Sequence, residues 1–230
     1  MDWTGSHADV IAKLLDDRRW SSSAAAFDAD GTLWEGDLGE LVLARLVASG
    51  HLPPDSVERY SALAQTDMVA ACAFCVRVMA GMPISHLSRA TGEVIVAREH
   101  GPLIAPTIEL AQELLRRGAE VWIVSGSSAF SVRPAAIHAG LGAAGVIAVT
   151  GGVEGDRLTG TVDAPVPCRR GKVEALQLAT RRPLLLASGN SDYDLDLLEH
   201  AEVRVAVGPR GRQTYLVTEA EKRGWVTLRI

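Results

Sequence analysis

FDADGTLW, residues 27–34, follows directly on a short apolar run that begins at Ala24. Such a run is typical of a buried strand, and Gly31-Thr32 ends it. Asp28 and Asp30 stand two residues apart at this end, and residues i and i+2 of a strand face the same side. Because open α/β sheets bind ligands at the carboxyl ends of their strands, we expect both carboxylates at a ligand site.

Two carboxylates this close repel each other, and a divalent cation relieves the repulsion. One carboxylate can then attack an electrophile while the other transfers protons. The alternative interpretation is an acidic turn that caps a helix, and these residues alone leave it open.

The composition predicts a folded protein without a nucleic-acid surface. The chain has 230 residues, of which 47% are apolar, enough for one sizeable domain and a modest insertion. Its net charge is −5, with Lys and Arg spread along the chain, so local positive charge or a cation must bind any anionic substrate. Without an apolar run of about 18 residues we expect no membrane span, and we predict a cytoplasmic protein.

Three cysteines are present, and their odd number without a secretory signal argues against a disulfide framework. Cys72 and Cys75 lie three apart in an apolar helical pattern. Core packing is favoured there over a zinc site, because no second such pair accompanies them.

Residues 37–101 differ from the rest of the chain, with four helical patterns and no convincing strand. The patterns cover residues 38–49, 55–64, 67–80 and 85–99. From residue 106 onward strands alternate with helices, which indicates a mostly parallel sheet. We therefore predict an α/β, Rossmann-like core of residues 1–36 and 102–230, with helices on both faces and an inserted all-helical cap of residues 37–101. Residues 146–153 and 158–162 flank a turn and predict a hairpin.

Three further motifs follow predicted strands or open a helix. Ser125-Gly126 suits a phosphate oxygen, although an ordinary turn explains it equally well. Lys172 opens a helix, where a cation is unfavourable unless it has a role such as offsetting the acidic pair. A solvated lysine is the alternative, and Arg169 and Arg170 compete for the role. Residues 189–194 (GNSDYD) place oxygen ligands after a buried strand, or else acids at a helix start.

In this order the four motifs resemble those of the haloacid dehalogenase (HAD) superfamily, and the helical insertion resembles its phosphoserine phosphatase-like subgroup. The resemblance implies that Asp28 is a nucleophile, that Asp30 is the general acid and base, and that Lys172 steadies the charge. It also implies phosphate binding by Thr32, Ser125 and Gly126. Mg²⁺ would be held by Asp28, by Asp30 through its backbone carbonyl, and by Asn190, with Asp194 supporting this shell. We expect the side chains of residues 28, 30 and 190 to meet around one cation.

The chain departs from the family pattern at the metal position, which usually carries aspartate and here carries Asn190. Substrate clues are Asp37, where the subgroup has a glutamate that meets the substrate amine, and Arg77, a candidate for a substrate carboxylate. Asp37 and Glu40 also match a capping box that opens the first inserted helix, and Arg77 can equally be a charge at a helix edge.

We therefore predict a Mg²⁺-dependent phosphatase that hydrolyses a small phosphorylated metabolite through an aspartyl-phosphate intermediate. A phosphoserine-like metabolite is one candidate substrate. Nucleic-acid and membrane partners are not expected, and the sequence does not indicate an oligomeric state. The alternatives are a dehalogenase, which needs no acid two residues after the nucleophile, and a weakly active binding or regulatory protein, which Asn190 would suit.

Overall fold

A six-stranded parallel sheet forms the centre of the computed structural model, which describes residues 6–230. Its strands, in spatial order, are β3 (Gly145–Val149), β2 (Glu120–Ser128), β1 (Ala24–Phe27), β6 (Leu184–Gly189), β7 (Val203–Gly208) and β8 (Val226–Arg229). The predicted α/β class is confirmed. β1 begins and ends where the apolar run of the sequence predicts it.

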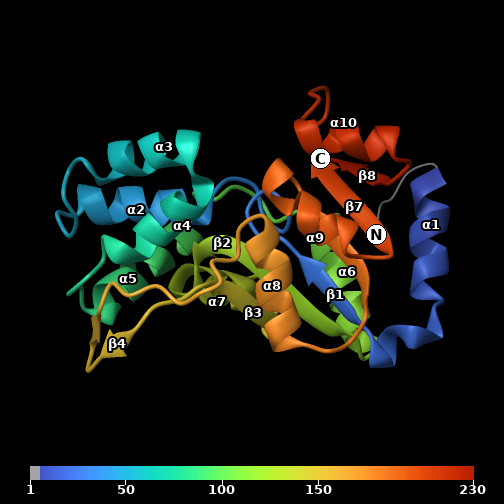
Figure 1. The fold of residues 1–230 in the computed structure, drawn as a ribbon, viewed down its shortest axis with the longest axis horizontal. Coiled ribbons are helices and arrows are strands. Elements are labelled where there is room, and N and C mark those ends of the chain that lie inside the picture. The colour runs from blue at the N-terminus through green and yellow to red at the C-terminus, as the bar shows by residue number, and fades with distance from the viewer. Residues whose placement is uncertain (1–5) are drawn as a thin grey trace.

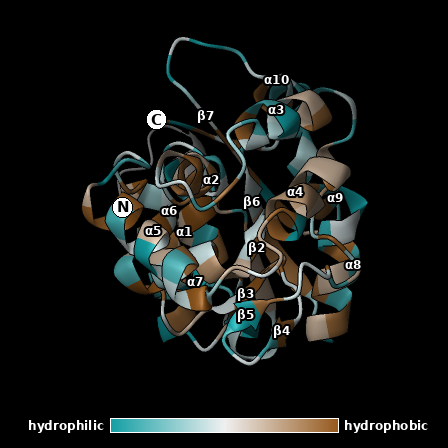
Figure 2. Cartoon of the chain, turned by 90° about the vertical axis from the view of Figure 1, so that its left-hand side faces the viewer, coloured by the Kyte–Doolittle hydropathy of each residue, from teal (hydrophilic) through white to brown (hydrophobic). Residues whose placement is uncertain are grey.

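Helices cover both faces of the sheet, and the alternation of side chains along β1 shows why. Ala25 and Phe27 belong to a hydrophobic cluster with residues of α1 (Ser6–Leu15), α6 (Ala105–Arg116) and α7 (Ala129–His138). Ala24 and Ala26 belong to a second cluster with residues of α8 (Arg170–Ala179), α9 (Leu195–Glu199) and α10 (Tyr215–Lys222). Both sides of the strand are therefore buried, as its uninterrupted apolar sequence requires. Figure 2 shows helices with both hydrophobic and hydrophilic residues around the strands.

Of the helices between β1 and β2 in the chain, the first four gather on the left of Figure 1, and α6 follows them. The four are α2 (Leu38–Ala48), α3 (Ser56–Thr66), α4 (Met68–Arg77) and α5 (Ile84–Val96). They agree with the four helical patterns of the sequence. Leu38, Val42 and Phe74 share one hydrophobic cluster with Phe27 and Ile123 of the sheet. The helical block thus packs directly on the sheet layers and shares their core.

The predicted hairpin is wrong in both strands: half of the first belongs to the main sheet, and Leu158 is the only residue of the second that lies in a strand. Residues 145–149 form β3, which pairs in parallel with β2 in the main sheet. Only β4 (Val153–Glu154) and β5 (Arg157–Leu158) make an antiparallel ribbon. After β3 the chain passes Gly151, where a Cβ atom would lie 2.1 Å from the Thr161 carbonyl oxygen. The chain leaves the sheet there before it turns back.

Asp28 follows the strand at which the sheet changes direction. From β1 the chain proceeds through β2 to β3 on one side, whereas β6, β7 and β8 extend the sheet on the other. Ligands of open α/β sheets bind at such a switch point, outside the carboxyl ends of the strands. Within the described residues, no helix has the length and apolar character needed to cross a bilayer.

Candidate functional site

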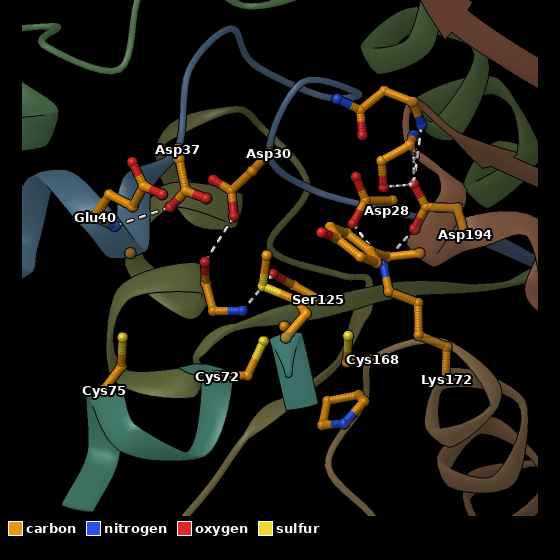
Figure 3. Close-up of a pocket in the computed structure, with 18 of the residues that line it drawn as sticks. Asp28, Asp30, Asp37, Glu40, Cys72, Cys75, Ser125, Cys168, Lys172 and Asp194 are labelled. Atoms are coloured by element: carbon orange, nitrogen blue, oxygen red, sulfur yellow. Dashed lines mark hydrogen bonds and ion pairs between the residues drawn. The ribbon is translucent and has the colours of Figure 1, made fainter. Parts of the chain in front are cut away.

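A cavity of about 200 Å³ opens at the carboxyl ends of β1, β2 and β6. We call one side of it the strand-end wall: Asp28, Asp30, Ser125, Gly126, Ser127, Pro167, Cys168, Lys172, Asn190, Ser191, Tyr193 and Asp194. The other side is the helical wall: Asp37, Gly39, Glu40, Tyr60, Met68, Cys72 and Cys75. Figure 3 shows Asp28, Lys172 and Asp194 together on one side, and Asp37 and Glu40 on the other.

Lys172 joins two buried carboxylates of the strand-end wall. Its Nζ lies 2.6 Å from Asp28 Oδ1 and 2.6 Å from Asp194 Oδ1. The three residues are 3%, 6% and 1% exposed respectively, so this is a desolvated triad. Burial opposes the ammonium form of Lys172, but the Asp194 and Asp28 carboxylates hold its pKa above its ordinary value. Lys172 is therefore charged at neutral pH.

Of the three cations that compete in the sequence, the structure brings Lys172 to Asp28, the first residue of the acidic pair, and to Asp194, but not to Asp30. The side chain of Arg170 is 83% exposed and pairs with Glu174. Arg169 pairs with Asp192 and lies over the Tyr193 ring. The first turn of α8 can pack tightly because residue 171 is glycine, where a Cβ atom would lie 2.0 Å from the Val166 carbonyl oxygen. That close packing carries the next residue into the core.

Asp28 uses its second oxygen for a contact within its own loop. Thr32 Oγ1 donates to Asp28 Oδ2 at 2.9 Å, and Thr32 is fully buried. Thr32 therefore orients the carboxylate and does not line the cavity. Burial raises the pKa of Asp28 to about 7, and the charge of Asp194 adds to this rise while Lys172 opposes it.

The Asp30 carboxylate points to a different set of donors. Asp30 Oδ1 accepts from Trp34 Nε1 and from the Leu38 backbone N–H, both at 2.8 Å, and Ser127 Oγ donates to Oδ2 at 2.7 Å. Both oxygens are thus engaged away from Asp28. The expectation that the side chains of residues 28, 30 and 190 meet around one cation is not met for Asp30. Of the Asp30 oxygens, the backbone carbonyl is the one left to bind a cation.

Asn190 and Asp194 belong to one loop after β6. Asp194 Oδ2 accepts from the Asn190 and Ser191 backbone N–H groups, both at 3.0 Å, and from Ser191 Oγ. Asp194 therefore holds this loop and Lys172 at once. The Asn190 amide lies against Gly31, where a Cβ atom would be 1.9 Å from Nδ2. Gly31 has φ +75°, so glycine suits this position both sterically and conformationally.

The donor set tests whether the site fits Mg²⁺. In the described part of the chain, no group of three or more His, Cys, Asp and Glu side chains is arranged to hold a metal ion. Mg²⁺ is usually bound by one or two carboxylates with waters and substrate phosphate rather than by a full protein cage. The Asp28 carboxylate, the Asn190 amide and the Asp30 carbonyl are hard oxygen donors at one end of the sheet. These residues fit that mode of binding.

Ser125 and Gly126, which the sequence analysis places after a strand, lie within the last four residues of β2. Both line the cavity, and Ser125 Oγ accepts from the Ser127 backbone N–H at 3.0 Å. A Cβ atom on Gly126 would lie 2.8 Å from Cys72 Sγ. The missing side chain therefore allows α4 to approach the strand end closely.

The two substrate clues of the sequence have different positions. Asp37 lines the cavity and also caps α2, because its Oδ1 accepts from the Glu40 backbone N–H at 2.8 Å. Burial raises the pKa of Asp37 well above its usual value, and the charge of Asp30 adds to this. Arg77 is exposed at the end of α4 and does not line the cavity.

The three cysteines are free and buried, and all of them line the cavity. Cys72 and Cys168 share a small hydrophobic cluster with Val76 and Val149. Burial raises the pKa of Cys75 to about 12. The preference for packing over a zinc site agrees with this environment.

Two residues that position Asp30 received no such role from the sequence. Ser127 directly follows the Ser125-Gly126 motif, but its spacing does not reveal which carboxylate its hydroxyl reaches. Trp34 is 1% exposed, and its indole binds a residue only four positions earlier. Trp34 stands only four positions after Asp30 in the sequence, and this short separation is the feature from which the hydrogen bond could have been predicted.

Comparisons with known proteins agree with this architecture. A model of the haloacid dehalogenase-like hydrolase family matches residues 25–199. No match was found among curated proteins.

Solved structures with related folds include two proteins of unknown function. One, from Bordetella pertussis Tohama I, has a TM-score of 0.74 at 22% identity, over 90% of this chain and 98% of that one. Another, from Anaerococcus prevotii DSM 20548, has a TM-score of 0.71 at 14% identity, over 97% and 90%. A phosphoserine phosphatase, described as a phospho-aspartyl intermediate analogue, has a TM-score of 0.58 at 20% identity, over 86% and 90%. At these identities the likeness concerns the fold.

Proposed function

The chain belongs to the haloacid dehalogenase-like hydrolases, and from this premise we propose that it is a Mg²⁺-dependent phosphatase of a small phosphomonoester. The observation that carries the proposal is the buried Asp28 carboxylate, paired with Lys172 at 2.6 Å beside the Ser125 and Gly126 end of β2. A carboxylate in this setting is a nucleophile for phosphorus, and aspartyl-phosphates are an established covalent intermediate.

In the proposed reaction Asp28 attacks phosphorus, and the bond to the leaving oxygen breaks. Asp30 delivers a proton to that oxygen and then takes one from the water that hydrolyses the aspartyl-phosphate. Ser127 suits this exchange, because a hydroxyl can donate to the Asp30 carboxylate and accept from the carboxylic acid. Lys172, Ser125 and the Gly126 N–H group, which line the same cavity, would hold the phosphoryl oxygens, where fixed positive charge is most effective.

We propose that Asp28, the Asp30 carbonyl and Asn190 hold Mg²⁺, with Asp194 fixing the Asn190 loop behind them. The ion would neutralise charge on the transferring phosphoryl group. We also propose that residues 37–101 act as a cap over a core of residues 1–36 and 102–230. The cavity supports this division, since α2, α3 and α4 form the wall opposite the strand ends. Such a cap would exclude bulk water during attack.

The decisive experiment measures hydrolysis of p-nitrophenyl phosphate with and without Mg²⁺ in the wild type and in Asp28→Asn. We expect Mg²⁺-dependent activity that falls by roughly 10⁴-fold or more in the variant, as for loss of a nucleophile. Asp55→Asn is the control, because Asp55 is exposed and its side chain makes no capping bond.

Two results would contradict the proposal. Halide release from a haloacid without metal would favour dehalogenase chemistry, and Asp30 would then be dispensable. Failure to turn over any phosphomonoester, while Mg²⁺ still binds, would favour a binding or regulatory role.

A further inference from the structure

Two of the three cysteines come from different parts of the fold and meet at the cavity. Cys72 lies on α4, in the helical wall, whereas Cys168 precedes α8, in the strand-end wall. In Figure 3 the three thiols lie in a row, with Cys72 next to Cys168. These two share one small cluster of buried residues, and Cys75 belongs to another. A bond between the two sulfurs would therefore join the two walls.

The thiols of Cys72 and Cys168 are in direct contact through a hydrogen bond. This bond raises the pKa of Cys72 and lowers the pKa of Cys168, which makes Cys72 the donor and the Cys168 sulfur the acceptor. The positive charges of Lys172 and Arg169 also lower the pKa of Cys168, while burial opposes them. Cys168 is thus the thiol that more readily becomes a thiolate, the form that reacts with oxidants.

The packing on both sides holds the two thiols together. A Cβ atom on Gly126 would lie 2.8 Å from Cys72 Sγ, so the glycine lets α4 bring this thiol close to the end of β2. On the other side, the Cys168 backbone N–H donates to the Val166 carbonyl oxygen at 2.8 Å, which fixes the chain before α8. A disulfide needs closely spaced and mutually directed Cβ atoms, and thiols already in contact favour it.

Cys75 provides a comparison within the same helix. It follows Cys72 by one turn of α4. Burial and the charge of Asp37 raise its pKa to about 12, so its thiolate is scarce at neutral pH. A bond between Cys72 and Cys75 would lie within α4 and would leave the two walls unconnected.

The thiols are buried from bulk solvent but line the cavity, through which a small oxidant can reach them. We propose that Cys72 and Cys168 form a reversible disulfide that ties α4 to the strand-end wall and stops turnover. The effect on turnover rests on the proposed function, because a cap tied to the core no longer opens to admit substrate and release product. The bond itself does not depend on that function.

Hydrogen peroxide is the oxidant in this proposal. The Cys168 thiolate attacks one peroxide oxygen, so that an S–O bond forms and the O–O bond breaks. The hydroxide that leaves takes up the proton lost by Cys168, which yields water and a sulfenic acid. The Cys72 sulfur then attacks the Cys168 sulfur. An S–S bond forms, the S–O bond breaks, and hydroxide leaves as water with the Cys72 proton. The two sulfurs lose two electrons, which the peroxide gains.

Peptide mapping after brief peroxide treatment of the whole protein tests the bond. Trypsin releases residues 60–77 and residues 158–169 as separate peptides, because Arg precedes and ends each of them. We expect one disulfide-linked species of these two peptides, which dithiothreitol separates. Fragmentation between Cys72 and Cys75 identifies the linked residue. The absence of this species, a link through Cys75, or a crosslinked dimer on a non-reducing gel would each overturn the proposal.

Activity toward p-nitrophenyl phosphate tests the consequence. The oxidised wild type should be slower than the reduced one by about tenfold or more, and dithiothreitol should restore the rate. Each variant is compared with its own reduced form, so differences in basal activity do not enter. Cys72→Ala and Cys168→Ala should not show the loss, whereas Cys75→Ala should show it as the wild type does.

The remaining outcomes separate the two proposals. A mapped disulfide without loss of activity would overturn the switch, and so would an equal loss in Cys72→Ala, since oxidation of Cys168 alone would then suffice. A reduced wild type that hydrolyses no phosphomonoester would instead defeat the proposed phosphatase function, while the mapping would still decide whether the disulfide forms.

Discussion

The two walls of the cavity are built in different ways. In the strand-end wall, Asp28, Asp30 and Asp194 each accept hydrogen bonds from side chains or backbone that hold both carboxylate oxygens. In the helical wall, Asp37 has one such contact, and thioether and thiol groups line much of the surface.

From this difference we expect the strand-end wall to carry the chemical step and the helical wall to affect substrate preference. A fully hydrogen-bonded constellation is preorganised, which favours a fixed chemical step. A wall with few directional contacts fixes no reacting group, and in the proposed function it would face the leaving group. Substitutions in the strand-end wall should therefore reduce turnover of every substrate, and those in the helical wall should alter substrate preference.

Lys172→Met should produce the largest effect. It leaves Asp28 and Asp194 buried without their shared cation, a change that costs about 3–5 kcal/mol of stability, and it should also remove activity. Urea unfolding measures the loss. Arg170→Ala is the control and should change the free energy of unfolding by less than about 0.5 kcal/mol.

The loss of unfolding free energy in Lys172→Met should also depend on pH. Lys172 lowers the pKa of Asp28, which burial raises, so its removal raises that pKa further above the unfolded value. A raised carboxyl pKa gives stability that is present at low pH and lost as the pH rises through the folded pKa. The deficit should therefore shrink between pH 7 and pH 5. A deficit that grows on acidification would contradict the desolvated triad.

Gly31→Ala should rank second. The substitution strains a residue at φ +75° by about 1–3 kcal/mol and also displaces the Asn190 amide, which lies where the new Cβ must go. Mg²⁺ binding, measured by calorimetry, should weaken. Gly50→Ala is the matched control, because Gly50 has φ +71° with nothing within 4 Å of the new Cβ. If both variants bind Mg²⁺ as the wild type does, Asn190 is not a ligand.

Ser127→Ala should have a moderate effect on rate. It removes the hydroxyl that donates to Asp30 Oδ2 at 2.7 Å, a bond to a charged group worth about 1.5–3 kcal/mol. We expect kcat for p-nitrophenyl phosphate to fall by about tenfold or more. KM should change less, because Ser127 acts through Asp30. A larger change in KM than in kcat would place Ser127 at the substrate instead.

Cys72→Ala in the helical wall should have the smallest effect. The lost thiol lies in a four-residue apolar cluster, and its removal should cost about 1 kcal/mol of stability. KM for p-nitrophenyl phosphate should rise more than kcat falls. If kcat fell as much in Cys72→Ala as in Ser127→Ala, the proposed difference in role between the two walls would be wrong.

The sequence by itself determined much of the local structure, and eight of the ten site residues that it predicts line the cavity. The apolar run at residues 24–27 and the acids after it predicted β1 and its ligand edge, because strand periodicity and a following glycine are local properties. The helical block at residues 37–101 followed from apolar spacing in the same way. The order of the four motifs then indicated the family.

Only the tertiary structure decided which side chains meet. Spacing could not choose between Arg169, Arg170 and Lys172, because the choice depends on how closely α8 approaches β1 and β6. It could not show that Asp30 is held by Ser127, 97 positions away in the chain. Nor could it divide residues 146–153 between two sheets, since strand pairing is a long-range property. Local sequence specifies backbone conformation, whereas packing specifies the partner of each polar group.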